Sequence, residues 1–133
     1  MAQRGALVDT SVLIDYFGGV ANRESRVLDL LLEQGPPPAT APIIVQEYLQ
    51  GLKDAAEFSL ASEDLESFDR LPPPDYPEHV EAADSHVRLR RKGLTIPTVD
   101  TLIVTLALRA NRPLLTRDRH QRDLARFVGV DLA

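Results

Sequence analysis

Four acidic residues lie at positions along the chain that favour a common site. Asp9 directly follows an apolar run, and Asp118 lies two residues after another. Glu47 and Asp100 lie close to the beginning of two segments with helical periodicity. Carboxylates gathered in a crevice raise one another's pKa, and a hard divalent cation relieves that repulsion. The residue types therefore predict a Mg²⁺ or Mn²⁺ site that leaves coordination positions open for phosphate oxygens and steadies charge on a phosphodiester.

Three hydroxyl residues lie beside these acids in the sequence, namely Thr10, Ser11 and Thr116. Hydroxyls at such positions hydrogen-bond carboxylate ligands or a metal-bound water. Each acid also has a simpler interpretation when taken alone: a cap on a turn, a favourable charge in the first turn of a helix, or a solvent-facing side chain. Their coincidence at one predicted edge of a sheet favours the site.

The elements that position the acids alternate between short apolar strands and helices. This alternation predicts an α/β fold, a three-layer α/β/α sandwich with a short, mainly parallel sheet. In such a sheet the strands end where the following helices begin, so the four carboxylates point into one crevice. We expect strands at 6–8, 39–41, 113–116 and 128–130, and helices at 11–17, 22–34, from 42, 54–70, 77–92, 99–110 and 119–127.

Length and composition limit the class of protein. The chain has 133 residues and no Cys, which favours one domain over 1–133 and excludes disulfides and thiol chemistry. No apolar run is long enough for a membrane span or a signal-peptide core, so we expect a cytoplasmic protein. The net charge of −5 conceals a polarised chain, because residues 54–84 carry ten acids and one base, whereas residues 88–126 carry ten bases and three acids.

Several arginines are candidates for binding nucleic-acid phosphates, since such binding is largely electrostatic. Arg117 and Arg119 flank Asp118, and Arg91 belongs to a basic run at 88–92. A solvated helix end is the alternative for the basic run. Aromatic residues make up 5% of the chain and Trp is absent, which disfavours binding by base stacking alone.

Four segments occur in an order and at a spacing typical of a known family. They are 7–15 (LVDTSVLID), 47–51 (EYLQG), 98–103 (TVDTLI) and 115–118 (LTRD). Together they resemble the four blocks of a PIN domain, most closely those of the VapC toxins of bacterial toxin–antitoxin pairs. The resemblance covers nearly the whole chain and implies a single PIN domain.

The resemblance also implies a Mg²⁺- or Mn²⁺-dependent endoribonuclease that cleaves a translation-related RNA, pairs with a cognate antitoxin and forms a homodimer. The acidic positions of the family match Asp9, Glu47, Asp100 and Asp118, with Asp9, Asp100 and Asp118 as metal ligands. The family often continues with a further acid and an aromatic residue. Here Arg-His-Gln follows at 119–121 and the next acid is Asp123, which leaves His120 and Asp123 as additional candidates.

Two other functions compete with this interpretation. One is a catalytically weak or inactive PIN module that acts by binding an antitoxin or nucleic acid, against which the complete set of four acids argues. The other is phosphoryl transfer through an aspartyl-phosphate at Asp9. The dehalogenase-type phosphatases need a second Asp two residues later, where this chain has Ser11. Receiver domains need a Lys after a late strand, where this chain has Thr116 and Arg117.

Overall fold

A four-stranded parallel sheet lies at the centre of the computed structural model, which describes residues 4–133. Its strands are β1 (Leu7–Val8), β2 (Ala39–Thr40), β3 (Asp69–Arg70) and β4 (Leu114–Leu115), in the spatial order β3-β2-β1-β4. β1 pairs in parallel with β2 and β4, and β2 pairs in parallel with β3. All four strands therefore end at the same edge of the sheet.

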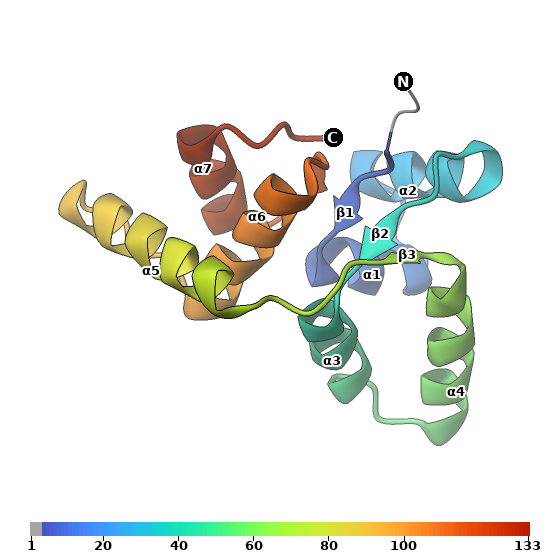
Figure 1. Ribbon diagram of the computed structural model, residues 1–133. Helices are drawn as coiled ribbons and strands as arrows, with labels where there is room; N and C mark the ends of the chain where they lie inside the picture. The colour runs from blue at the N-terminus through green and yellow to red at the C-terminus, as the bar shows by residue number, and fades with distance from the viewer. Residues whose placement is uncertain (1–3) are drawn as a thin grey trace.

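Within residues 4–133, seven α-helices and one short 3-10 helix surround the sheet. Figure 1 shows α5, α6 and α7 on one side of the strands and α1 to α4 on the other. The predicted α/β/α sandwich is thereby confirmed. The helices are α1 (Thr10–Phe17), α2 (Arg23–Gln34), α3 (Pro42–Gln50), α4 (Ala55–Asp64), α5 (Tyr76–Arg91), α6 (Thr98–Ala110) and α7 (Arg119–Val128), and the 3-10 helix η1 is Leu65–Ser67. No helix in this described part is long and apolar enough to cross a membrane.

Strands β1 and β4 are apolar because helices cover both of their faces. Both residues of β1 and both residues of β4 are fully buried, within a single hydrophobic cluster to which α1, α3, α6 and α7 contribute. Buried parallel strands carry apolar side chains on both faces, which explains why these segments lack alternation. The chain before β1 also packs closely: a Cβ added to Gly5 would lie 1.9 Å from the carbonyl oxygen of Pro37.

Three strands lead almost directly into helices at the edge where they end. Asp9 follows β1 and caps α1, and its side chain accepts a hydrogen bond from the backbone N–H of Ser11. Pro42 occupies the first turn of α3, where a missing N–H costs nothing. Asp118 caps α7 soon after β4. Capping chemistry thus brings two of the predicted site acids to this edge.

Two predicted elements were wrong. The helix expected over 54–70 ends at Asp64, because the chain turns through η1 to bury Leu65 and Phe68 and then continues as edge strand β3. The strand expected at 128–130 is absent, since α7 continues to Val128 and Gly129 ends it in the left-handed conformation. The chain meets the sheet only afterwards, in an isolated bridge between Leu114 and Leu132.

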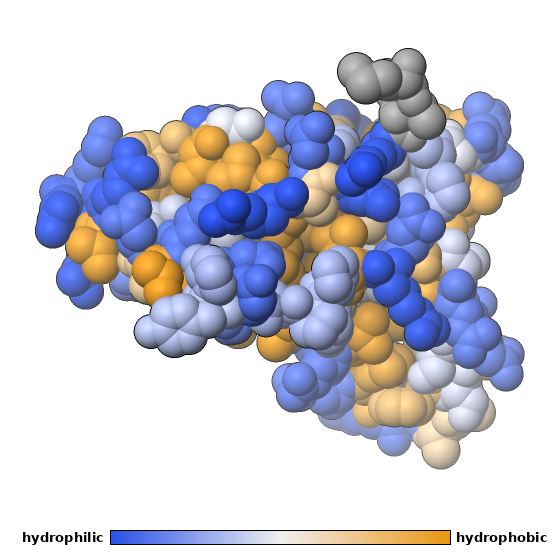
Figure 2. Space-filling view, viewed as in Figure 1, coloured by the Kyte–Doolittle hydropathy of each residue, from blue (hydrophilic) through white to orange (hydrophobic). Residues whose placement is uncertain are grey.

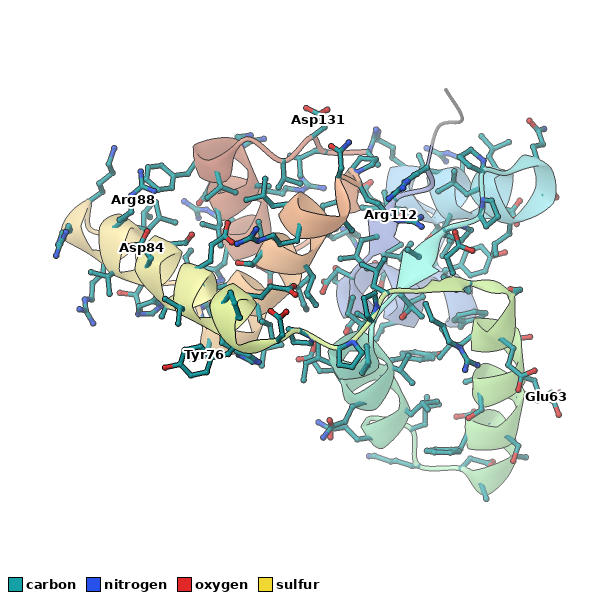
Figure 3. The ribbon with its side chains drawn as sticks, in the orientation of Figure 1. Glu63, Tyr76, Asp84, Arg88, Arg112 and Asp131 are labelled. Carbon is teal, nitrogen blue, oxygen red and sulfur yellow. The ribbon has the colours of Figure 1, made fainter. Side chains whose placement is uncertain are left out.

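At the opposite end of the sheet, the Arg112 side chain joins the segment before β1 to the outer strand β3. It follows α6 and donates hydrogen bonds to the carbonyl oxygen of Gly5 at 2.9 Å and to Asp69 at 3.1 Å (labelled Arg112 in Figure 3). Figure 2 shows apolar side chains exposed around α3 and α4, where Phe58 is 45% and Leu60 is 61% exposed.

Candidate active site

Asp9 and Asp100 lie together, and Gln121 joins them. The Nε2 atom of Gln121 donates to Oδ1 of Asp9 at 2.8 Å and to Oδ1 of Asp100 at 3.0 Å. Asp9 is 3% exposed and Gln121 is 1% exposed, so this contact is shielded from solvent. Residues more than 90 positions apart in the sequence are brought together because β1, α6 and α7 meet at the edge where the strands end.

A network of hydroxyls holds the second oxygen of Asp9. Oδ2 accepts the backbone N–H of Ser11 at 3.0 Å and the hydroxyl of Thr116 at 3.4 Å. The Thr116 hydroxyl also accepts the backbone N–H of Asp118 at 3.0 Å and lies 3.5 Å from the Ser11 hydroxyl. The structure thus brings Ser11 and Thr116 to the acids, and Thr10 donates to Oε1 of Glu47 at 3.2 Å.

Burial and neighbouring charges shift the pKa of two of the acids. For Glu47, burial raises the pKa most, the Thr10 hydroxyl lowers it, and the charges of Asp9, Asp100 and Asp118 raise it further. Burial likewise raises the pKa of Asp100, with further increases from Asp118 and Asp9 and a lowering by Gln121. Glu47 therefore senses the charges of the other three acids, and Asp100 senses those of Asp118 and Asp9, as expected for acids that share one crevice.

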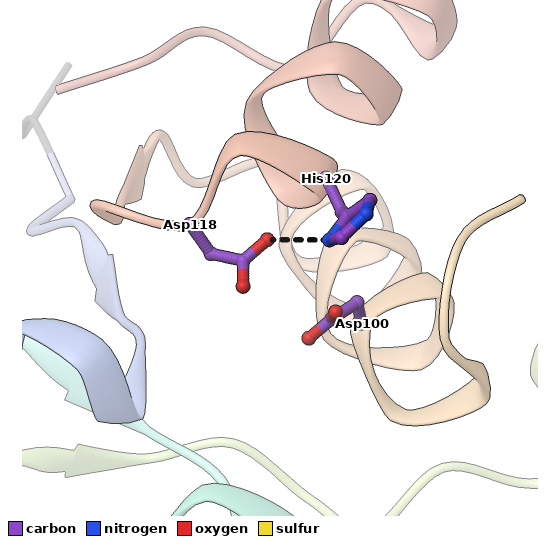
Figure 4. A group of neighbouring side chains, drawn as sticks. All are labelled: Asp100, Asp118 and His120. Atoms are coloured by element: carbon purple, nitrogen blue, oxygen red, sulfur yellow. Dashed lines mark ion pairs between the residues drawn. The ribbon is translucent and has the colours of Figure 1, made fainter. Parts of the chain in front are cut away.

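Asp118 and His120 occupy the outer side of this site. Figure 4 shows Asp100, Asp118 and His120 facing one another, and ligand atoms of the three lie within 4.8 Å of each other. Nδ1 of His120 is 3.6 Å from Oδ1 of Asp118, and the His120 side chain is 51% exposed. Asp123, the other additional candidate, pairs instead with Arg126 on the same helix at 3.9 Å.

The three predicted phosphate-binding arginines lie in different places. Arg117 is exposed beside the site, forms an ion pair with Asp15, and donates its backbone N–H to the Ser11 hydroxyl. Arg119 is exposed in the first turn of α7. Arg91 ends α5, close to the C-terminal end of α7, whereas Asp118 lies at the beginning of α7. The structure does not bring Arg91 to the acids.

Gln121 was missed by the sequence reasoning, although a signal was present. Asp118 caps α7 and Gln121 occupies its third helical position, a spacing typical of a capping box. In that motif the glutamine side chain bonds the backbone N–H of the cap residue. Here the Thr116 hydroxyl accepts that N–H instead, and the Gln121 amide points to Asp9 and Asp100. The spacing thus predicts where Gln121 lies, and the neighbouring Thr116 redirects its side chain.

The donor set fits a hard divalent cation. Four carboxylates provide the oxygen ligands that Mg²⁺ and Mn²⁺ prefer, and burial together with neighbouring negative charge raises the pKa of two of them. One further acceptor is available: the buried Oε1 atom of Gln121 has no hydrogen-bond partner among the described residues. The residues present therefore suit Mg²⁺ or Mn²⁺.

Comparison with protein families gives an assignment for this arrangement. The sequence profile of the PIN domain matches residues 6–127, which includes all four acids and every element from β1 to most of α7. The chain belongs to the PIN domain family. The family predicted from the four sequence blocks is thus confirmed. A comparison with curated proteins found no match.

Solved structures share this PIN domain fold over nearly the whole chain. A toxin–antitoxin complex from Klebsiella pneumoniae is 27% identical, with a TM-score of 0.65 and 95% of each chain covered. VapBC2 from Rickettsia felis, bound to a DNA fragment from its promoter, is 19% identical, with a TM-score of 0.76 and 96% coverage of both chains. FitAcB from Neisseria gonorrhoeae is 23% identical, with a TM-score of 0.73 and coverage of 96% and 95%.

Proposed function

We propose that this PIN domain is a Mg²⁺- or Mn²⁺-dependent endoribonuclease and the toxin of a VapBC-like toxin–antitoxin pair. The observation that carries the proposal is the meeting of Asp9, Glu47, Asp100 and Asp118 at the edge where the strands end, where burial, with added repulsion from neighbouring acids, raises the pKa of Glu47 and Asp100. PIN domains are generally nucleases, which agrees with this donor set.

Each acid has a role that its surroundings support. Asp9, Asp100 and Asp118 are assigned to the cation, since Asp9 is fixed by three donors and Asp118 by its own helix. When bound, such a cation lowers the pKa of a water molecule and stabilises charge on a phosphodiester. Glu47 is assigned to orient a water molecule and accept its proton, because a carboxylate with a raised pKa is a stronger base.

Phosphate binding is assigned to the arginines nearest the acids. Arg117 and Arg119 flank Asp118, and the pair between Arg117 and Asp15 keeps this guanidinium beside the site. His120 is exposed next to Asp118 and is a further donor toward a phosphate when protonated. Arg91, at the far end of α5, is assigned at most to a distant segment of the same RNA.

A partner protein and a homodimer belong to the same proposal. One solved structure that shares this fold is a toxin–antitoxin complex and another is VapBC2 bound to promoter DNA, and these support a cognate antitoxin for this chain. A nuclease acting on translation-related RNA needs such an inhibitor in the cell that makes it.

RNA cleavage by the purified protein tests the proposal. Total cellular RNA is incubated with Mg²⁺, with Mn²⁺ or with EDTA, using wild type, Asp9→Asn and Asp100→Asn. Asp123→Asn is the matched control, because Asp123 pairs with Arg126 on the surface of α7. We expect discrete fragments that need metal, persist in the control and vanish in the two site variants.

Two results would overturn the enzymatic assignment. Absence of cleavage by folded, antitoxin-free protein under every metal condition favours a module that acts by binding alone. Cleavage that survives both Asp9→Asn and Asp100→Asn assigns the activity to other residues or to a contaminant.

A further inference from the structure

Gln121 contributes an amide side chain that lies between two acids of the site, Asp9 and Asp100. It is 1% exposed, comes from the first turn of α7, and reaches between β1 and α6. Its Nε2 atom has two N–H bonds, and the two contacts to Asp9 and Asp100 use both of them. Its Oε1 atom, equally buried, has no hydrogen-bond partner among residues 4–133.

In this arrangement both carboxylates receive a hydrogen bond from Gln121, and only the nitrogen of the Gln121 amide is paired. A buried acceptor without a partner costs free energy, so an amide orientation that leaves Oε1 unpaired needs compensation. The compensation comes from the two acids, because hydrogen bonds to charged groups are stronger than those between neutral groups. The positive end of the Gln121 amide dipole thus lies where negative charge is most concentrated.

A divalent cation and this amide nitrogen compete for the same negative charge. The N–H groups carry partial positive charge, so they are repelled by a cation held by Asp9 and Asp100. Turning the Gln121 side chain away from the two carboxylates removes that repulsion.

From these contacts we infer that Gln121 is a neutral placeholder for the divalent cation, holding Asp9 and Asp100 in the metal-free protein and giving up both hydrogen bonds when the cation binds. The inference rests on the proposed metal dependence of this site. Gln121 is a positioning residue in the metal-free protein, and its hydrogen bonds oppose metal binding. Removing them therefore makes the cation bind more tightly while making the metal-free protein less stable.

Calorimetric titration with Mg²⁺ and with Mn²⁺ tests this sign. Gln121→Met keeps the length of the side chain without its donors, and Gln121→Glu adds a permanent oxygen ligand. Gln34→Met, at the exposed end of α2, is the matched control. We expect affinity to rise about tenfold in Gln121→Met, equivalent to about 1.4 kcal/mol, to rise further in Gln121→Glu, and to stay unchanged in Gln34→Met.

Thermal unfolding in EDTA provides a second test, because it measures the stability of the metal-free protein. The melting temperature of the metal-free protein should fall in Gln121→Met and fall further in Gln121→Glu, while saturating Mg²⁺ should restore more of the stability in each variant than it adds to wild type. Weaker metal binding in Gln121→Met than in wild type would overturn the inference, because it would mean that Gln121 positions the carboxylates for the cation. Failure of wild type to bind either metal would overturn the proposed function as well.

A measurement on the wild-type protein tests the inference even if the Gln121 variants fail to fold. The side-chain NH₂ signals of Gln121 are followed by ¹⁵N NMR during a Mg²⁺ titration. We expect slow exchange of these protons with water in EDTA, then a large shift and faster exchange once Mg²⁺ is bound. Signals that stay unchanged at saturating Mg²⁺ would refute the exchange of partners.

Discussion

Replacing Asp100 by asparagine should stabilise the metal-free protein while abolishing its metal response. Oδ1 of Asp9 and Oδ1 of Asp100 are no more than about 6 Å apart, because the same nitrogen lies 2.8 Å and 3.0 Å from them. At an effective dielectric constant of about 20, two charges at that distance repel by about 3 kcal/mol. The variant also loses a favourable charge in the first turn of α6 and a charge-assisted hydrogen bond, together about 1 kcal/mol.

The net gain is about 1 to 2 kcal/mol, which raises the melting temperature by about 3 to 6 °C for a domain of this size. The assay is thermal unfolding in EDTA at pH 7.5, with and without excess Mg²⁺, and with Asp123→Asn as the control. Mg²⁺ should raise the melting temperature of wild type and of the control, and leave Asp100→Asn unchanged. A melting temperature of Asp100→Asn in EDTA equal to or below that of wild type would refute the repulsion.

The same variant provides a pH dependence with a defined sign. The pKa of Asp100 is raised in the folded protein, so folding favours its protonated form. This contribution to stability is fully present below the pKa of the unfolded chain and is lost as pH rises through the folded pKa. The stabilisation of Asp100→Asn over metal-free wild type should therefore be largest at neutral pH and shrink as the solution is acidified. A difference that grows on acidification would contradict this assignment.

Two further predictions concern the scaffold. Gly5→Ala places a Cβ 1.9 Å from the Pro37 carbonyl oxygen and should lower the free energy of unfolding in urea by about 3 kcal/mol. The control Gly51→Ala meets nothing closer than 3.5 Å, and its free energy of unfolding should stay within about 0.5 kcal/mol of wild type. Equal effects of the two substitutions would refute the steric argument. Burial and a hydrogen bond to Asp29 raise the pKa of Tyr16 to about 12, so a tyrosinate absorbance change should be centred near that pH. Tyr16→Phe should remove this absorbance change, and Asp29→Asn should shift it to lower pH.

The fold and the four acids could be predicted from sequence because the relevant signals are local. Apolar runs followed by Asp9 or by Asp118 mark strands that end in helix caps, and parallel pairing then brings those ends together. Strand β3 could not be predicted in this way, since both of its residues are exposed and only backbone bonds to β2 define it. An edge strand of this kind leaves no hydrophobic pattern.

The candidate site was predicted by charge, and its neutral member was missed for the same reason. Gln121 carries no charge and lies in a polar helix, where an amide ordinarily faces solvent. Its orientation depends on Thr116, which accepts the backbone N–H that a capping-box glutamine would otherwise bond. Competition between two side chains for one donor is a three-dimensional property that spacing alone does not reveal.

The pairing of β1 with β4 has a consequence during protein synthesis. β1 lies between β2 and β4, and its backbone bonds to β4 run from Leu7 to Pro113 and from Asp9 to Leu115. A ribosome adding roughly 5 to 20 residues per second makes β4 about 5 to 20 s after β1. Throughout that interval Asp9 has neither Thr116 nor Gln121 beside it. The nascent chain therefore exposes Asp9 before the other parts of the site exist. The four acids of this protein come together only after that interval.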